Sequence, residues 1–205
     1  MNKIRMIALA ACMAATLDAS AQEQEIRLFS HRGGRMEHDE NTLSAFQASY
    51  DAGYRGFETD IRMTRDGALV ITHDSSLERT TDGTGTVEEK TEAEIRRLRT
   101  KQGNKVLFLD ELLEFLEGKE GLYVEFEMKT KPEALYPEER LHAYCDKLYD
   151  AVMAVKPADA TFVFTSGDYR GLRYLQAKHP GVDLLLITSK PCNDETIDLC
   201  KAMGI

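Results

Sequence analysis

The stretch GFETDIRMTRDGALVITHD, residues 56–74, decides how this chain folds, because it combines a strand pattern, a turn signal and clustered polar groups. In an extended strand, Glu58 and Asp60 point to one face, while the residues that alternate with them point to the other. Burying two carboxylates side by side costs several kcal/mol unless a cation lies close to them. The stretch therefore predicts a cation beside this strand.

The same stretch predicts a β-hairpin over residues 56–74. Asp66-Gly67 lies between two runs rich in β-forming residues, and the connection is too short for a parallel return. A two-residue turn at Asp66-Gly67 would place His73 directly opposite Asp60, and directly opposed residues share a face of the sheet. We therefore expect His73 to lie beside Asp60.

Along the rest of the chain, apolar runs alternate with helical patterns. The patterns predict further strands over 26–33, 122–129, 161–166 and 183–189, and helices over 41–53, 91–100, 109–118, 137–156, 168–179 and 194–204. Such alternation is typical of an α/β fold with a parallel sheet. We expect five parallel core strands, with the hairpin projecting beyond them.

Composition indicates one sizeable core and an acidic protein. Of the 205 residues, 42% are hydrophobic, which is enough for one core, and the formal net charge is -9. Non-specific binding to nucleic acid needs a basic footprint, so we expect no nucleic-acid partner.

The first 21 residues resemble an export signal. Lys3 and Arg5 precede an apolar run over 6–17, and Ala19-Ser20-Ala21 is typical of a cleavage site. Because a membrane-spanning helix needs about 20 apolar residues, we expect no transmembrane segment. These features predict a periplasmic or extracellular protein whose mature domain covers 22–205. The alternative is a lipid anchor at Cys12, since LAAC at 9–12 resembles a lipoprotein signal.

Polar side chains gather where three predicted strands end. His31 and Arg32 end the first strand, and Glu125, Glu127 and Lys129 alternate along one face of the third. The carboxyl ends of parallel strands meet at one edge of a sheet, where ligands bind. Glu58, Asp60 and one carboxylate of the third strand would therefore form an all-oxygen site for Mg²⁺ or Ca²⁺.

The surrounding residues suit chemistry at a phosphodiester. His31 and His73 would form an acid/base pair, because unperturbed imidazole titrates near pH 6.5. Arg32 and Lys129 would hold anionic oxygens while the cation neutralises developing charge. Each motif also has a structural interpretation: Glu-x-Asp on a strand can be a solvated face, and HRGG can be a turn that uses glycine at positive φ. Their coincidence at three strand ends favours function.

The motifs together resemble the glycerophosphodiester phosphodiesterase family, metal-dependent TIM barrels of the phospholipase-C-like phosphodiesterase group. The matching pieces are HRGG (31–34), ENTLSAF (40–46), the stretch 56–74, LERTTDGTG (77–85) and EMK (127–129). The resemblance implies a small-molecule phosphodiester substrate, cleaved to glycerol 3-phosphate and an alcohol. It implies that His31 and His73 are the catalytic acid/base pair. It also implies that Glu58, Asp60 and Glu127 bind the metal, and that Arg32 and Lys129 contact the phosphate.

The predicted strands make up only part of such a barrel. A (β/α)₈ barrel has eight parallel strands, usually in about 250 residues, and five are expected here. We therefore expect a TIM-type barrel truncated after about five strands. Two alternatives to the leading function follow. One is a non-catalytic fragment or phospho-ligand-binding remnant, and the other is a lysophospholipase D-like phosphodiesterase of the same superfamily.

Overall fold

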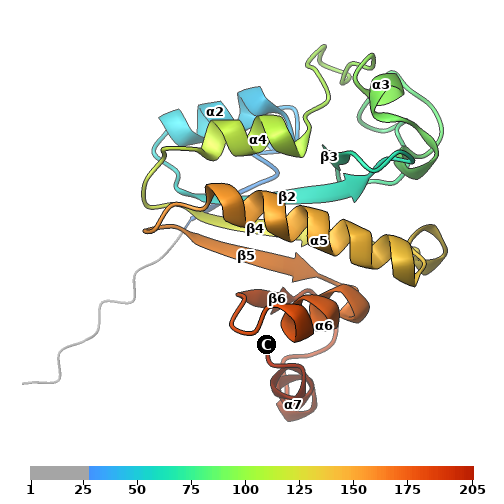
Figure 1. Ribbon diagram of the computed structural model, residues 1–205. Coiled ribbons are helices and arrows are strands. Elements are labelled where there is room, and N and C mark those ends of the chain that lie inside the picture. Colours follow the sequence, from blue (N-terminus) through green and yellow to red (C-terminus); the bar gives the residue numbers. More distant parts are fainter. Residues whose placement is uncertain (1–27) are drawn as a thin grey trace, which may run out of the picture.

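The computed structural model describes residues 28–205, which form a curved sheet with helices packed along it (Figure 1). The predicted export signal over 1–21 and the alternative lipid anchor at Cys12 lie outside the described residues. Among the helices in the described part of the chain, none is long and apolar enough to cross a membrane.

The sheet contains the five predicted parallel strands and the hairpin. Its strands run in the order β1-β2-β4-β5-β6, all neighbours on this path are parallel, and β3 pairs antiparallel with β2. The register places His31 opposite Glu58 and Asp60 opposite Glu127, which brings the predicted site residues onto adjacent strands. The strands are β1 (Phe29–His31), β2 (Gly56–Met63), β3 (Leu69–Ile71), β4 (Tyr123–Met128), β5 (Thr161–Ser166) and β6 (Leu184–Leu186).

Side-chain caps mark the starts of several helices, although the helix predicted over 91–100 covers only Glu92–Ile95. Thr91 and Glu94 form a capping box, in which each side chain accepts a hydrogen bond from the backbone N–H of the other residue. Thr42 caps another helix by accepting from the Ala45 N–H. The helices are α2 (Leu43–Asp51), α3 (Glu92–Ile95), α4 (Leu109–Leu116), α5 (Glu138–Val155), α6 (Tyr169–Lys178) and α7 (Asp194–Ala202), with single 3₁₀ turns η1 (Val87–Glu89) and η2 (Glu133–Leu135).

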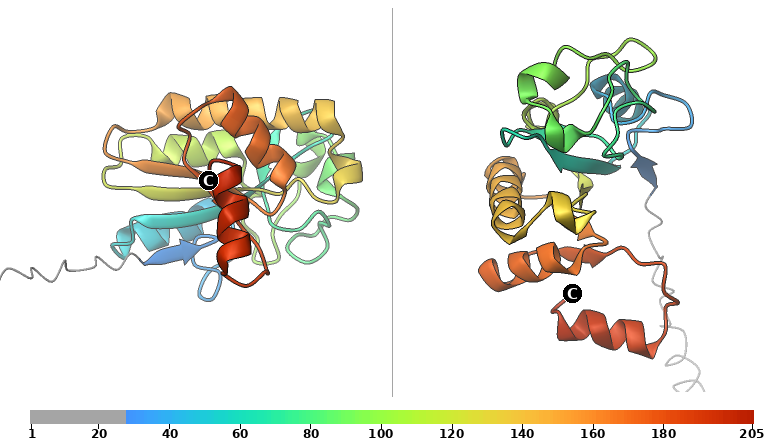
Figure 2. Two further views of the ribbon diagram at one scale, coloured as in Figure 1. Left: turned by 90° about the horizontal axis from the view of Figure 1, so that it is seen from below. Right: turned by 90° about the vertical axis from the view of Figure 1, so that its right-hand side faces the viewer.

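The main core lies between the sheet and its helices. Helices α5 and α6 lie along the same side of the strands (Figure 2), and buried residues of α4, α5 and α6 join one cluster with outward residues of β2, β4 and β5. Along β4, Val124, Phe126 and Met128 belong to this core, while the alternating Glu125 and Glu127 are only half buried. The charged residues therefore lie on the face that the helices do not cover.

The β2–β3 hairpin forms, but the predicted two-residue turn is wrong. The pairs are Arg62 with Val70 and Met63 with Leu69, so every partner lies one residue earlier than expected. The strands are closed by a hydrogen bond from the Thr64 N–H to the Ala68 carbonyl. Three residues thus form the loop, and Gly67 at φ 91° takes its left-handed position. Thr72, whose N–H donates to the Asp60 carbonyl, lies where His73 was expected.

Replacing Gly67 with alanine is expected to destabilise the hairpin by about 1–2 kcal/mol. A Cβ at this position would meet nothing within 4 Å, so the cost comes only from holding an L-residue at positive φ. Chemical denaturation of the wild type, Gly67→Ala and Gly67→Asn measures it. Because asparagine tolerates the left-handed region better, Gly67→Asn should lose less. Equal stability of all three proteins would contradict the three-residue loop.

Candidate active site

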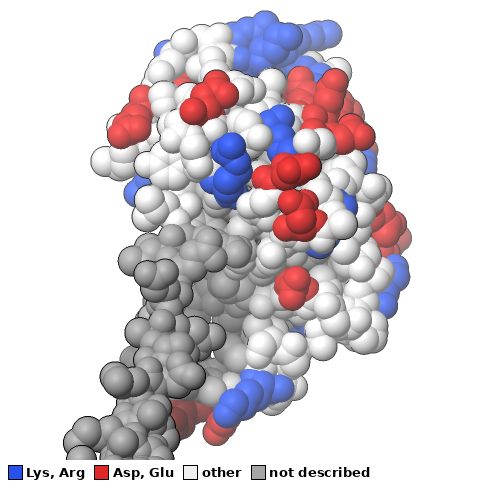
Figure 3. All heavy atoms as spheres, turned by 90° about the vertical axis from the view of Figure 1, so that its left-hand side faces the viewer, with Lys and Arg blue, Asp and Glu red and all other residues white. Residues whose placement is uncertain are grey.

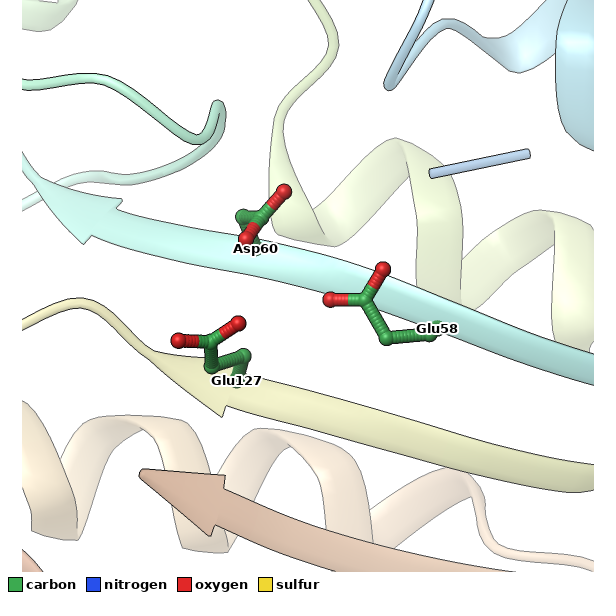
Figure 4. Close-up of side chains that lie close together, drawn as sticks. All are labelled: Glu58, Asp60 and Glu127. Atoms are coloured by element: carbon green, nitrogen blue, oxygen red, sulfur yellow. The ribbon is translucent and has the colours of Figure 1, made fainter. Parts of the chain in front are cut away.

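Three carboxylates converge on the uncovered face of the sheet. Glu58 and Asp60 come from β2, and Glu127 comes from the neighbouring position on β4 (Figure 4). One oxygen from each lies within 4.8 Å of the other two. Asp60 is fully buried, and Glu58 is 8% exposed. Of the two β4 carboxylates that the sequence left open, Glu127 joins this group, while Glu125 lies opposite Glu58 and outside it.

The cations of the chain balance these charges incompletely. Lys129 Nζ lies 2.6 Å from Glu127 Oε1 and 3.2 Å from Asp60 Oδ1, and Arg32 Nε lies 3.2 Å from Asp60 Oδ2. Yet Glu58 Oε1 is buried without a hydrogen bond, and Asp60 Oδ1, also buried, has the Lys129 ion pair but no hydrogen bond. Burial raises the pKa of Glu58 to about 8, and repulsion from Asp60 and Glu127 adds to the rise.

A buried carboxylate oxygen without a hydrogen bond and a raised carboxyl pKa are features that a bound cation would relieve. The donors are oxygens alone, which is the set that Mg²⁺ and Ca²⁺ prefer. Glu58, Asp60 and Glu127 therefore fit a divalent cation. Ion pairs from Arg32 and Lys129, together with a bound cation, would offset the cost of burying two carboxylates on one face of β2.

The HRGG turn delivers His31 and Arg32 to this cluster. β1 ends at His31, and Arg32 follows at φ 53°, so the chain reverses within a run of left-handed residues that Gly33 and Gly34 continue. The Arg32 N–H donates to both the carbonyl and Oε2 of Glu58, at 3.1 Å each. His31 Nε2 lies 3.5 Å from the same carboxylate. The turn thus places an imidazole and a guanidinium on either side of the carboxylates.

His31 is suited to accept a proton near neutral pH. Burial lowers its pKa, and the nearby charges of Arg32 and Arg35 lower it further. The neutral imidazole is then the dominant form at pH 7, and half of the side chain is exposed.

His73 reaches the site from beyond the end of β3. Burial is the largest influence on the pKa values of His31 and Glu127, and the His73 imidazole also lies close enough to act on both. Its Nδ1 lies 2.7 Å from Asp74 Oδ1. The role of His73 stays a prediction, and the register that placed it opposite Asp60 was wrong.

Asn41 supports the site in a way that the strand patterns did not predict. Its side-chain amide donates to Asp60 Oδ2 at 2.8 Å, and its N–H donates to the Arg32 carbonyl at 2.8 Å. Asn41 itself lies at φ 57°, a conformation that asparagine tolerates better than most residues. The signal was present in the ENT motif, although no pattern in the sequence indicates which residue the Asn41 side chain contacts.

A buried ion pair between Arg62, further along β2, and Glu88 was also missed by the sequence-based prediction. Arg62 lies on β2, where every residue is buried, and its Nη1 lies 2.9 Å from Glu88 Oε1. Its Nε donates to the His73 carbonyl at 3.0 Å, and its Nη1 donates to the Lys129 carbonyl at 3.3 Å. This arginine therefore ties together the segments that hold His73 and Lys129. An arginine within a fully buried strand was the available signal.

The opposite end of the sheet, at the amino-terminal ends of the strands, carries charges of both signs (Figure 3). These acidic and basic side chains are interspersed among neutral ones. The convergent carboxylates and both histidines lie toward the carboxyl ends instead, where ligands bind in parallel α/β folds.

Parallel strands with helices on one side, and an acidic triad toward their carboxyl ends that could hold a metal ion, are typical of a TIM-type barrel protein. The model of the Glycerophosphoryl diester phosphodiesterase family matches residues 31–203, and the chain belongs to this family. A curated glycerophosphodiester phosphodiesterase from Caldanaerobacter subterraneus subsp. tengcongensis is 36% identical over 123 residues, which cover 56% of this chain and 50% of the relative. The chain thus spans about half the length of the curated relatives it matches.

Solved structures share the fold. A phosphodiesterase from Oleispira antarctica, in complex with the product sn-glycerol-3-phosphate, superimposes with a TM-score of 0.76 at 24% identity, over 87% of this chain and 72% of that one. A glycerophosphoryl diester phosphodiesterase from Parabacteroides distasonis gives a TM-score of 0.67 at 27% identity, over 89% of this chain and 61% of that one. The predicted fold class is confirmed by these structures.

Proposed function

We propose that this protein is an exported phosphodiesterase that uses a divalent cation, Mg²⁺ or Ca²⁺, to hydrolyse glycerophosphodiesters to glycerol 3-phosphate and an alcohol. The observation that supports it best is the convergence of Glu58, Asp60 and Glu127 within 4.8 Å, with His31 3.5 Å from Glu58. Family membership and the product named for the Oleispira antarctica enzyme support the choice of substrate.

The three carboxylates would hold the cation. When bound, it supplies positive charge to the phosphoryl oxygens, on which negative charge grows as the reaction proceeds. Arg32 and Lys129, both within 3.2 Å of Asp60, lie where they would contact the same oxygens. Their fixed positions lower the reorganisation needed when the transition state forms.

The two histidines would move the protons. Hydrolysis forms one bond from an attacking oxygen to phosphorus and breaks the bond to the alcohol oxygen. One imidazole takes the proton from the attacking oxygen, and the other gives a proton to the departing alcohol. Unperturbed imidazole titrates near pH 6.5, so histidine as a residue type suits either part.

Release of glycerol 3-phosphate from glycerophosphocholine tests this proposal. The purified chain should form the product, lose the activity in EDTA, and regain it when Mg²⁺ or Ca²⁺ is added. A parallel assay with lysophosphatidylcholine separates the lysophospholipase D-like alternative, because choline release from that substrate alone would favour it.

Two controls make the result decisive. Thermal unfolding shows whether the chain is folded, since a cooperative transition is expected of a single packed domain. A chain that unfolds cooperatively yet releases no product would contradict the activity and favour a phospho-ligand-binding remnant. Activity that persists in EDTA would contradict the cation's role.

A further inference from the structure

Arg79 lies in the LERTTDGTG segment, which follows the hairpin and is not used by the proposed mechanism. Its side chain bridges two carboxylates that come from distant parts of the chain. Nη1 and Nη2 donate to the two oxygens of Glu40, at 2.9 and 2.6 Å, and Nε donates to Asp74 Oδ2. This is a bidentate pair plus a third charge-assisted hydrogen bond from one guanidinium.

Each of these two carboxylates also contacts a residue of the proposed site. Glu40 Oε1 accepts from Arg32 Nη1 at 3.2 Å, and Asp74 Oδ1 lies 2.7 Å from His73 Nδ1. One guanidinium thus connects to the phosphate-binding arginine on one side and to the imidazole on the other. Exposed ion pairs contribute little by themselves, but Glu40 is only 14% exposed and Asp74 26%.

We propose that Arg79 is a positioning residue, which fixes the orientations of Arg32 and His73 through Glu40 and Asp74. The proposal rests on the proposed function of those two residues. A carboxylate beside Nδ1 keeps the proton of a neutral imidazole on that nitrogen and leaves Nε2 free to exchange protons. Arginine suits the task better than lysine, because its planar fork binds two carboxylates in a fixed geometry.

The charge states agree with this arrangement. Burial acts to raise the pKa of Asp74, but the hydrogen bonds from Arg79 and His73 outweigh it and lower the pKa to about 2. The hydrogen bond from Arg79 is also the largest cause of the lowered pKa of Glu40. Both carboxylates are therefore ionised and able to accept throughout the neutral range.

The test compares Arg79→Gln with Arg79→Lys and with the control Arg97→Gln. The control removes the same charge from an exposed arginine nearby. In Arg79→Gln, kcat for glycerophosphocholine should fall about 10- to 100-fold, as is typical when a partner that orients a functional histidine is lost. Arg79→Lys should recover part of the loss, because lysine keeps the charge but cannot bind both carboxylates. Arg97→Gln should match the wild type.

A second measurement does not depend on activity. Nitrogen-15 NMR of the His73 ring, assigned with His73→Gln and recorded on the protein in EDTA, reports which ring nitrogen carries the proton. We expect the Nδ1–H form in the wild type and a rise of the Nε2–H form in Arg79→Gln and in Asp74→Asn.

These results separate the two ideas. A tautomer shift in a chain without phosphodiesterase activity would support the positioning of His73 and refute the proposed function. An unchanged tautomer together with wild-type kcat in Arg79→Gln would overturn the positioning role. A change in thermal stability without a change in tautomer would also overturn it, because a merely structural salt bridge behaves in that way.

Discussion

Alanine substitution of His31 or of His73 is expected to lower kcat for glycerophosphocholine by about 10²- to 10⁴-fold, the usual contribution of a positioned acid or base. His31 lies 3.5 Å from Glu58, and His73 is close enough to influence the pKa values of both His31 and Glu127. Removing either imidazole leaves one proton transfer to water. Because neither histidine belongs to the acidic triad, cation binding should be largely retained.

Steady-state kinetics and calorimetric titration of Mg²⁺ or Ca²⁺ check the two halves of this expectation. His142→Ala is the matched control. His142 lies on α5, where its imidazole stacks on Tyr174, and it is not part of the acidic triad. Full activity in either site variant would defeat the acid/base assignment. Loss of cation binding together with activity would instead place the histidine among the metal ligands.

The free energy of unfolding of the cation-free protein is expected to fall as the pH rises from about 4.5 to about 8. Burial raises the pKa of Glu58 from 4.5 to about 8 in the folded chain. Between these values the folded chain binds more protons than the unfolded chain, so raising the pH favours unfolding. The loss is on the order of 1.4 kcal/mol for each pH unit over which only the folded state keeps that proton. The raised pKa of Glu127, caused first by burial, acts in the same direction.

Urea unfolding in EDTA at several pH values between 5 and 8 measures this slope. Glu58→Gln cannot titrate at this position, so its slope should be shallower. Added Mg²⁺ or Ca²⁺ should stabilise the wild type most at high pH, because a cation binds the ionised carboxylates and releases the proton. A wild-type stability that is constant or rises over this range in EDTA would contradict the account of the buried carboxylates.

Much of the fold follows from local patterns in the sequence. Alternation of Glu125 and Glu127 with apolar residues marked both faces of β4. The hairpin register did not follow, because Asp66-Gly67 suits turns of two lengths. Local hydrogen bonds decide between them: Thr64 Oγ1 donates to Asp66 Oδ1 at 2.6 Å and accepts from the Ala68 N–H at 2.8 Å.

The main residues of the candidate site could be predicted from the sequence, but the residues that support them could not. Charged side chains on buried strands stand out from their neighbours, so Glu58, Asp60 and Glu127 could be found from the pattern and the resemblance. Their supporting residues could not, because Asn41 reaches Asp60 from a loop and Arg79 reaches Glu40 across 39 residues of sequence. Such contacts depend on the tertiary path of loops, which no short period in the sequence records.

Strand β2 also constrains how this protein can evolve. Its two faces serve different purposes: Phe57 and Ile61 fill the core, while Glu58 and Asp60 converge with Glu127. One inserted or deleted residue between Gly56 and Asp60 would exchange the faces, burying carboxylates among the helices and turning apolar side chains toward Glu127. A substitution in β2 changes one side chain at a time, whereas an insertion or deletion changes the face of every residue after it. We therefore expect the length of β2 to vary less than its residues.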